Sequence, residues 1–372
     1  MKLGILCTMI NGFGRRGYYN SQEIGLGRAL ARKGHEVMIY KGIDPSEKEE
    51  KVQVEKNLTI WYLPMKHLGA HGFMDCKYLD PQLKALFCFG DQQIFLPHVY
   101  RWCRRRRIPF VAYVGTAHSL DSNFKSKVMN ALFAAGTLRI YKKNPVLAKT
   151  SAAKEELRQL GVPHAVIAPV GLDNAVLKKN IPADEKMRLR KEHGFEADDV
   201  ILCNVSRLSW EKRPLELIDL FLQVKGKKKF KLIIVGNGPL EEELNEKIRK
   251  NGLEKEVKIY PNVPYEKMWE IYEMSDYYLN MNKGEIFGMA IMEAVYYKTS
   301  VAAIRALGPS VTLKDMKGHK LCENDDEMAE WITGPYPSEK DLQESSEKMA
   351  ATFTWERCAD AFLQASSEKS SR

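Results

Sequence analysis

Short apolar runs alternate along the chain with longer stretches in which apolar residues recur every three or four positions. The short runs have the length of buried strands, and the longer stretches have the period of helices with one apolar face. Strands are predicted at residues 2–10, then as strand two within the segment 34–40 that opens with a turn at Gly34, and at 58–63, 85–89, 109–114, 147–149 and 165–168. They recur at 200–205, 232–235, 257–260, 277–281 and 301–304. This alternation predicts an α/β fold with parallel sheets and helices on both faces.

The alternation is interrupted in a way that predicts two domains. From residue 173 to 182 the periodicity is lost, and Asn, Lys and Pro accumulate as in a linker. A chain of 372 residues also has the length of two domains. Earlier, the charged stretch 46–54 is expected to be a loop. We predict a Rossmann-like domain at 1–172, a linker at 173–195, a second Rossmann-like domain at 196–352, and a final helix with a frayed tail at 353–372.

The composition is typical of a soluble globular protein. Hydrophobic residues make up 44% of the chain and charged residues 28%, and no apolar run approaches the length that spans a bilayer. Residues 1–10 lack the cleavage site of a signal peptide and are expected to form a buried strand. The seven cysteines are scattered without a Cys-x-x-Cys pair, which indicates a reducing, cytoplasmic location and argues against zinc or a disulfide framework.

The net charge of +9 is unevenly distributed along the chain. Five arginines surround a tryptophan in the segment 101–107. They either close a helix at its negative end, exposed to solvent, or contact anionic lipid headgroups. Peripheral membrane contact through Arg104, Arg105, Arg106 and Arg107 therefore stays open. Nucleic acid is not expected as a partner, because no helix-turn-helix, zinc finger or aromatic stacking strand accompanies the charge.

The run Glu-Ile-Phe-Gly-Met-Ala-Ile-Met-Glu, from Glu285 to Glu293, carries the clearest chemical signal. It places one carboxylate on an expected strand-to-helix turn and a second one eight positions later, in the helix. The N–H groups of Gly288, Met289 and Ala290 and the positive end of the helix dipole suit a phosphate. The two carboxylates on either side of that anion could each accept hydroxyl protons. A ligand that is anionic in the middle and hydroxyl-rich at both ends is a nucleotide-sugar.

Two other turns are expected at the same edge of the sheet. Arg207 and Lys212 lie just past the strand 200–205, where a guanidinium and an ammonium suit a diphosphate. The strand 230–235 ends in Gly236, a second tight turn into a helix. Because ligands of open parallel sheets bind at the carboxyl ends of the strands, we expect these turns to form one site.

Together these residues resemble the C-terminal domain of the family-4 retaining glycosyltransferases. The resemblance is strongest over residues 204–294 and covers nearly the whole chain. It implies the GT-B fold, in which two Rossmann-like domains face each other across a cleft and the last helix crosses back to the first domain. It also implies transfer of a sugar from a nucleoside diphosphate, with UDP expected, to a glycan, lipid-linked or small-molecule acceptor, as in polysaccharide or glycolipid biosynthesis.

The resemblance also implies roles for individual residues. Glu285 would hold sugar hydroxyls and Glu293 the ribose hydroxyls, while Arg207, Lys212 and the helix N–H groups would stabilise charge on the departing diphosphate. The family implies a retaining, front-face transfer in which the leaving phosphate takes the acceptor proton. No Asp-x-Asp occurs in the chain, so the usual metal–diphosphate device is missing, and neither a metal nor another cofactor is expected.

The first domain contains a glycine motif with two interpretations. Residues 12–17 match Gly-x-Gly-x-x-Gly after a strand and before a helix, as in dinucleotide-binding proteins. The acidic ribose ligand expected after strand two is missing, and Lys41 stands there, which an NADP enzyme could tolerate. The resemblance instead assigns this loop, with Gly17, to the donor diphosphate and His118 to the donor sugar. Asp91 also follows the end of a strand, and its position there fits either an acceptor contact or an ordinary surface residue.

Alternatives to a transferase remain at this point. They are a non-catalytic, glycosyltransferase-like binding subunit, an NADP-dependent oxidoreductase, and a GT-B-fold epimerase that would release sugar without an acceptor. The loop that begins at Ala306 lacks the glycine-rich turn and the Pro-Glu pair that the family usually has. That loop therefore gives no information on the donor sugar.

Overall fold

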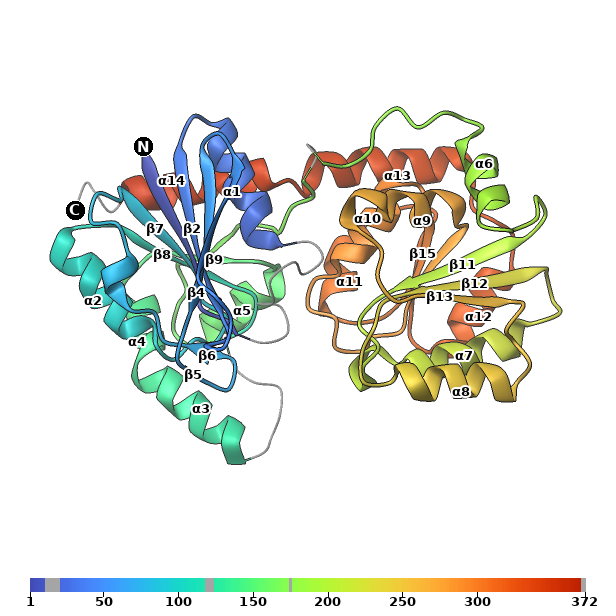
Figure 1. The fold of residues 1–372 in the computed structure, drawn as a ribbon, viewed down its shortest axis with the longest axis horizontal. Helices are drawn as coiled ribbons and strands as arrows, with labels where there is room; N and C mark the ends of the chain where they lie inside the picture. Colours follow the sequence, from blue (N-terminus) through green and yellow to red (C-terminus); the bar gives the residue numbers. More distant parts are fainter. Residues whose placement is uncertain (11–20, 118–123, 174–175, 369–372) are drawn as a thin grey trace. The chain divides into compact units, whose positions relative to one another are not determined.

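The structure is a computed structural model that describes residues 1–10, 21–117, 124–173 and 176–368. The chain divides into two compact units. Unit 1 comprises Met1–Gly171 together with Phe353–Arg372, and unit 2 comprises Leu172–Thr352. Each unit is built on a largely parallel sheet flanked by helices, so the predicted α/β fold is confirmed (Figure 1). None of the described helices combines the length and the apolar character needed to cross a membrane.

Unit 1 contains an eight-stranded sheet in the order β10-β9-β8-β7-β1-β2-β4-β3. Its strands are β1 (Lys2–Cys7), β2 (Glu36–Ile43), β3 (Glu50–Glu55), β4 (Leu58–Pro64), β7 (Ala85–Phe89), β8 (Phe110–Val114), β9 (Val146–Ala148) and β10 (Val166–Ile167), and a separate hairpin pairs β5 (His67–Leu68) with β6 (His71–Gly72). The central strands are almost fully buried, as apolar runs covered by helices on both faces should be.

The prediction of a loop at 46–54 holds for 46–49 but is wrong from Glu50 onward, where β3 begins. This strand pairs antiparallel with β4 alone and lies at the edge of the sheet. Its residues are half-buried or exposed, so charged side chains are tolerated there and no apolar run marks the strand.

The helices of unit 1 include the last helix of the chain. They are α1 (Gln22–Arg32), α2 (Leu96–Arg106), α3 (Phe124–Ala135), α4 (Thr137–Tyr141), α5 (Ser151–Gln159) and α14 (Trp355–Glu368), with a 3-10 turn η2 (Cys76–Tyr78). A Cβ atom at Gly25 of α1 would lie 2.2 Å from Trp355 Nε1, and one at Gly171 would lie 2.0 Å from the Trp355 backbone nitrogen. Only glycine, which has no Cβ atom, allows these close approaches, and through them α14 packs on unit 1. The predicted return of the last helix is therefore confirmed.

Unit 2 contains a six-stranded, fully parallel sheet in the order β13-β12-β11-β14-β15-β16. Its strands are β11 (Val200–Val205), β12 (Phe230–Val235), β13 (Val257–Tyr260), β14 (Tyr277–Asn280), β15 (Ser300–Ile304) and β16 (Lys320–Cys322). Its helices are α6 (Glu185–Glu192), α7 (Pro214–Val224), α8 (Glu241–Lys250), α9 (Met268–Met274), α10 (Met289–Tyr296), α11 (Leu307–Thr312), α12 (Asp325–Thr333) and α13 (Glu339–Thr352), with 3-10 turns η3 (Trp210–Lys212) and η4 (Tyr265–Lys267). In Figure 1, α7 and α8 cover one face of this sheet, and α9, α10 and α13 cover the other.

Part of the predicted linker 173–195 is folded into unit 2. Within it, α6 carries Arg190, which is 5% exposed and donates to Asp276 Oδ2 at 2.6 Å. The same carboxylate oxygen accepts the backbone N–H of Ile201 at 2.8 Å. Asp276 therefore ties α6 to the first strand of the unit 2 sheet, a partnership that the local pattern does not reveal.

The strand order of unit 2 reverses between β11 and β14. From β11 the chain proceeds outward to β12 and β13, and from β14 it proceeds outward the other way to β15 and β16. The loops that follow β11 and β14 consequently lead to helices on opposite faces of the sheet, α7 and α10 (Figure 1). Ligands of open α/β sheets bind at such a reversal, outside the carboxyl ends of the strands.

Candidate functional site

Two charged side chains meet at the reversal in unit 2. Lys212 ends η3, a few residues after β11, and Glu285 follows β14. Their side chains are joined by an ion pair of 2.9 Å from Lys212 Nζ to Glu285 Oε2, across 73 positions of sequence. Both side chains are mostly buried, with 21% and 16% of their surfaces exposed. The fold thus brings together two of the residues that the sequence assigned to one site.

The loop after β14 is held by two buried asparagines. Asn280 Oδ1 accepts the backbone N–H of Asn282 at 3.0 Å, and Asn282 Oδ1 accepts that of Gly284 at 2.9 Å. Asn282 Nδ2 also donates to Glu285 Oε2 at 3.0 Å, beside the Lys212 contact. Asparagine side chains that bond two residues ahead are typical of tight turns. Their effect here is to fix the position of the Glu285 carboxylate.

The Glu285 carboxylate is stabilised in its ionised form. Burial is the largest influence and would raise its pKa, but the charge of Lys212 and hydrogen bonds from Lys212, Asn282 and the Phe287 N–H outweigh burial and lower the pKa below its ordinary value. Glu285 is therefore an anion at neutral pH. It can accept hydrogen bonds from hydroxyl groups, and it leaves the other two N–H donors of the Lys212 ammonium for a further anion.

Helix α10 begins directly behind this pair. Its N-cap, Gly288, has φ +88°, which glycine adopts without strain. The N–H groups of the first turn of a helix have no partner within the helix, so those around Met289 and Ala290 are donors suited to an anion. The predicted donor groups thus stand at the amino end of α10. Arg207, in the loop after β11, is exposed to solvent.

Glu293 lies just over one turn into α10 and is enclosed. It is 1% exposed, and Tyr272 Oη donates to its Oε2 at 2.9 Å. The pKa of Tyr265 is raised by burial and by the negative charge of Glu293, which places that carboxylate close to a second phenol. Burial and the charge of Glu293 also raise the pKa of Tyr297. The assignment of Glu293 to ribose hydroxyls stays a prediction.

Gly236 serves the packing between two loops. It has φ +144°, and a Cβ atom there would lie 1.9 Å from the Ser206 carbonyl oxygen. Next to it, Leu208 donates its N–H to the Asn237 carbonyl at 2.9 Å. The turn after β12 therefore lies directly against the turn after β11. A role of Gly236 in donor binding would act through this backbone geometry.

In unit 1, Asp91 follows β7 and bonds within the unit. Its Oδ2 accepts from Lys149 Nζ at 2.6 Å, and its Oδ1 accepts from the Gly115 N–H and, at 3.3 Å, from the Thr116 N–H. Both oxygens thus hold the carboxyl ends of β7, β8 and β9 together, and any acceptor contact of Asp91 stays a prediction. Gly17 and His118 lie outside the described residues.

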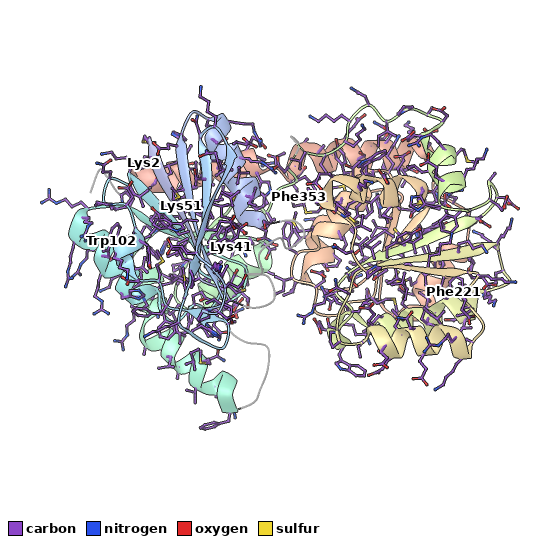
Figure 2. All side chains as sticks on the ribbon, in the orientation of Figure 1. Lys2, Lys41, Lys51, Trp102, Phe221 and Phe353 are labelled. Carbon is purple, nitrogen blue, oxygen red and sulfur yellow. The ribbon has the colours of Figure 1, made fainter. Side chains whose placement is uncertain are left out.

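The position of Lys41 tests the alternative of an NADP-dependent oxidoreductase, which would need a cation there for the 2′-phosphate of NADP. The residue is 2% exposed, and its Nζ donates to Glu23 Oε1 of α1 (Figure 2 labels Lys41). Burial would lower its pKa, but the charge and the hydrogen bond of Glu23 raise it overall. This ammonium is committed to an internal ion pair, so it is not placed to receive the 2′-phosphate of NADP.

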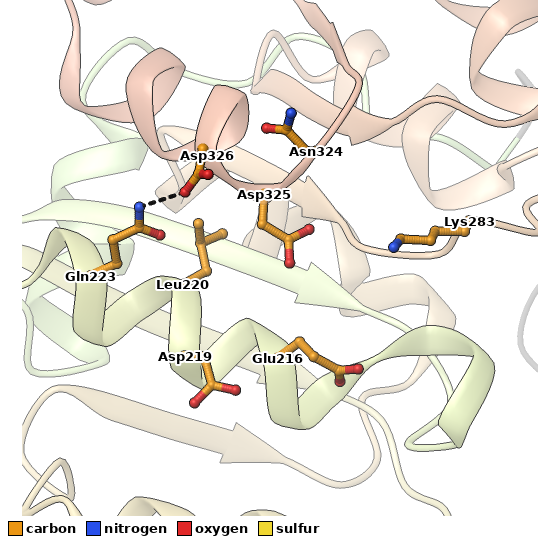
Figure 3. Close-up of a pocket in the computed structure, with 8 residues that line it drawn as sticks. All are labelled: Glu216, Asp219, Leu220, Gln223, Lys283, Asn324, Asp325 and Asp326. Carbon is orange, nitrogen blue, oxygen red and sulfur yellow. Dashed lines mark hydrogen bonds between the residues drawn. The ribbon is translucent and has the colours of Figure 1, made fainter.

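A groove between α7 and α12 has the wrong charge for a diphosphate. It encloses about 400 Å³ and is lined by Glu216, Asp219, Leu220, Gln223, Lys283, Asn324, Asp325 and Asp326 (Figure 3). Four of these eight residues are carboxylates, and only one is a cation. Among the described residues, no three His, Cys, Asp or Glu side chains are grouped so that they could share a metal ion.

Asn280, Asn282 and Tyr272 are site residues that the sequence analysis did not single out. Two asparagines at alternate positions, one at the last residue of a strand and one just after it, are a recognisable signal for a hydrogen-bonded turn. Tyr272 gave no such signal, because its spacing in α9 is that of an ordinary core residue.

The architecture and the site define a class of protein. Two α/β units with parallel sheets, of which the first also receives the last helix of the chain, form the GT-B fold. The Anabaena protein HepE, solved with UDP and glucose, has a similar structure with a TM-score of 0.71 and 16% identity, over 99% of this chain and 100% of that chain.

Sequence comparisons add the family. Residues 185–348 match the family model described as glycosyl transferases group 1. The D-inositol 3-phosphate glycosyltransferase of Xylanimonas cellulosilytica is 22% identical over 97% of this chain and 94% of its own length. The alpha-monoglucosyldiacylglycerol synthase of Acholeplasma laidlawii is 20% identical over 73% of each chain. Residues 185–348 thus match the group 1 glycosyltransferases, so the resemblance to glycosyltransferases with the GT-B fold is confirmed, whereas the retaining character stays a prediction.

Proposed function

We propose that this chain is a retaining, metal-independent glycosyltransferase that transfers a sugar from a UDP-sugar to a small-molecule, glycan or lipid-linked acceptor. The observation that carries this proposal is the Lys212–Glu285 pair, which Asn282 fixes at the strand-order reversal of unit 2, directly before the amino end of α10. The pair offers a cation for a diphosphate and an anion for sugar hydroxyls within one hydrogen bond of each other.

The compared proteins support the substrates in this proposal. HepE was solved with UDP and glucose, which favours UDP as the carrier. One relative is named for transfer to D-inositol 3-phosphate and another as a synthase of a glycosylated diacylglycerol. Both a small phosphorylated acceptor and a lipid acceptor are therefore within the proposal. A lipid acceptor would make peripheral membrane contact through Arg104, Arg105, Arg106 and Arg107 useful to a cytoplasmic protein.

The chemistry follows from the charges at the site. The bond between sugar C1 and the phosphate oxygen breaks, and its electron pair leaves with the diphosphate. The acceptor hydroxyl oxygen bonds to C1 on the same face, and its proton passes to the departing phosphate oxygen. Lys212, Arg207 and the first N–H groups of α10 oppose the growing negative charge, and one such group typically contributes about 2.7–4 kcal/mol. Glu285 orients Lys212 and accepts from sugar hydroxyls.

A binding experiment tests the donor site first. We expect UDP to raise the unfolding temperature of the protein more than GDP, ADP or NADP⁺ does. Arg207→Ala should weaken the shift because it removes an exposed cation of the site. Arg249→Ala is the matched control, since Arg249 is an exposed arginine on α8 of the same unit. A shift with NADP⁺ alone would refute the proposal and favour the oxidoreductase.

A turnover experiment tests the catalytic part. The protein with a UDP-sugar and candidate acceptors should release UDP and form a product with unchanged anomeric configuration, in EDTA as in buffer. A strict need for Mg²⁺ or Mn²⁺ would refute metal independence, and an inverted product would refute retention. UDP binding without turnover over a broad acceptor panel would favour a non-catalytic binding subunit.

A further inference from the structure

One stretch of unit 1 contains more positive charge than the net charge of the entire chain. Residues 92–154 contain twelve lysines and arginines and a single acid, Asp121. The remaining residues contain 45 basic and 47 acidic side chains, out of totals of 57 and 48. The excess of +9 therefore originates in this stretch alone. Lys149 is buried in its ion pair with Asp91 and is not part of the surface charge. The local excess of the other cations indicates an anionic partner for one part of the surface rather than general solubility.

Helix α2 presents much of this charge to solvent. Arg101 and the four arginines at 104–107 are exposed, and neither α2 nor residues 124–143 contain an acid. The Arg106 guanidinium lies 4.6 Å from the centre of the ring of Trp102, which is half-buried. Figure 2 labels Trp102. Exposed arginines beside a half-buried tryptophan suit the headgroup level of a lipid surface.

Helix α3 presents a row of apolar side chains. Phe124, Val128 and Leu132 are spaced four residues apart, so they lie along one side of the helix, and they are 82%, 42% and 48% exposed within the described part of the chain. The opposite side of α3 packs against the core of unit 1. Phe133 is 2% exposed and packs in the unit 1 core. A helix with an outward apolar row of this kind lacks a covering partner among the described residues.

The two helices are neighbours through α4. Helix α4 contacts both α2 and α3, as Figure 1 also shows along one side of unit 1. A Cβ atom at Gly136, between α3 and α4, would lie 3.2 Å from Pro97 of α2. Phe73, which is 44% exposed, stacks on His98 of α2 with 4.2 Å between the ring centres and adds an exposed apolar side chain beside α2.

We infer that α2 and α3 form a docking surface for an anionic lipid bilayer, with the α2 arginines on the headgroups and the α3 row in the apolar boundary. Nucleic acid would match the arginines but not an exposed row of Phe124, Val128 and Leu132, whereas a lipid surface matches both. This inference deepens the membrane contact in the proposed function and adds the lipid-inserting helix. It depends on no residue of the donor site.

Vesicle co-sedimentation of the full chain tests this docking. We expect binding to vesicles that contain anionic phosphatidylglycerol, little binding to phosphatidylcholine alone, and weakening by salt. Replacing Arg104 and Arg105 with Gln should weaken binding roughly five-fold per arginine, because each contributes through headgroup charge. Val128→Ser with Leu132→Ser should weaken it on the order of ten-fold or more and leave the salt dependence in place.

Matched variants separate docking from nonspecific effects. Lys225→Gln with Lys227→Gln removes two exposed cations of unit 2, and Met187→Ser removes an exposed apolar side chain of unit 2; neither should change vesicle binding. Absence of binding to anionic vesicles would overturn the inference, and so would an equal loss of binding in these control variants. It would also be overturned if the wild-type protein were a dimer and the Val128→Ser/Leu132→Ser variant a monomer, because a second copy of the chain would then cover the α3 row. Duplex DNA competing as well as anionic lipid would also overturn it.

The UDP shift is measured on the same samples. Vesicle binding without a UDP shift would leave the docking surface in place and refute the donor site. A UDP shift without vesicle binding would do the reverse. Variants that keep the wild-type UDP shift are folded, so their loss of vesicle binding reports on the docking surface alone.

Discussion

Replacing Lys212 with Met should separate the catalytic from the structural contribution of the Lys212–Glu285 pair. The change removes the ammonium but keeps an unbranched side chain of similar length. Of the described residues that stabilise the Glu285 carboxylate, which is 16% exposed, Asn282 and the Phe287 N–H remain. Breaking a fully buried pair costs about 3–5 kcal/mol. Because both partners here are partly exposed, we expect about 1–3 kcal/mol in the free energy of unfolding.

The expected loss of activity is larger and has a different cause. Lys212 is proposed to oppose charge on the departing diphosphate, and loss of one such group lowers turnover about 10²–10³-fold. The double variant Lys212→Met/Glu285→Gln should recover most of the stability, since no unpaired carboxylate remains, but it should not recover turnover. Urea unfolding and UDP release measure the two quantities on the same protein. Lys186→Met is the control, because it breaks a 2.8 Å ion pair with Asp276 elsewhere in unit 2.

The pH dependence of stability supplies a sign that can be checked. The folded-state pKa of Glu285 is lowered, so its ion pair stabilises the protein above the ordinary glutamate pKa of about 4.3, and that contribution is lost as the pH falls through the folded value. In Lys212→Met, the positive charge that counteracts the effect of burial on Glu285 is gone, so the pKa of Glu285 should rise. The stability difference between the two proteins should therefore shrink toward acidic pH. Turnover within about three-fold of wild type, or a difference that grows with acid, would refute this reasoning.

Three further substitutions test the packing around the units. Gly25→Ala places a Cβ atom 2.2 Å from Trp355 Nε1, so it should lower the free energy of unfolding by about 1–3 kcal/mol and change tryptophan fluorescence. An unchanged spectrum and stability would contradict the packing of α14 against α1. Arg213→Ala removes the two hydrogen bonds of 3.0 and 2.7 Å to Asp325, so it should lower the free energy of unfolding in urea by about 1–3 kcal/mol and leave UDP affinity unchanged. Loss of the UDP shift would show that this pair also shapes the site. Gly288→Ala, at φ +88°, should cost about 1–2 kcal/mol and weaken UDP binding, and unaltered binding would exclude the amino end of α10 as the diphosphate site.

The sequence alone determined the class of fold and the neighbourhood of the site. Apolar runs and helical periods depend only on local spacing, so the alternation over residues 200–304 was enough to predict a parallel sheet. The run from Glu285 to Glu293 and the cations Arg207 and Lys212 could be assigned to one edge because parallel strands end together. The edge strand β3 was missed, since a strand with one neighbour and an exposed face needs no apolar run.

The tertiary structure decided which partner each of these side chains has. Lys212 bonds to Glu285, whereas Glu293 is enclosed by Tyr272 of another helix, and Asp91 is bonded by Lys149. These partners lie between 21 and 73 positions away in the chain. Spacing rules describe neighbours within one helix or strand, but burial and ion pairing depend on side chains that only folding brings into contact. The local sequence thus determined at which edge of the sheet the charged residues lie. The packing of distant elements determined which of these residues form internal ion pairs and hydrogen bonds.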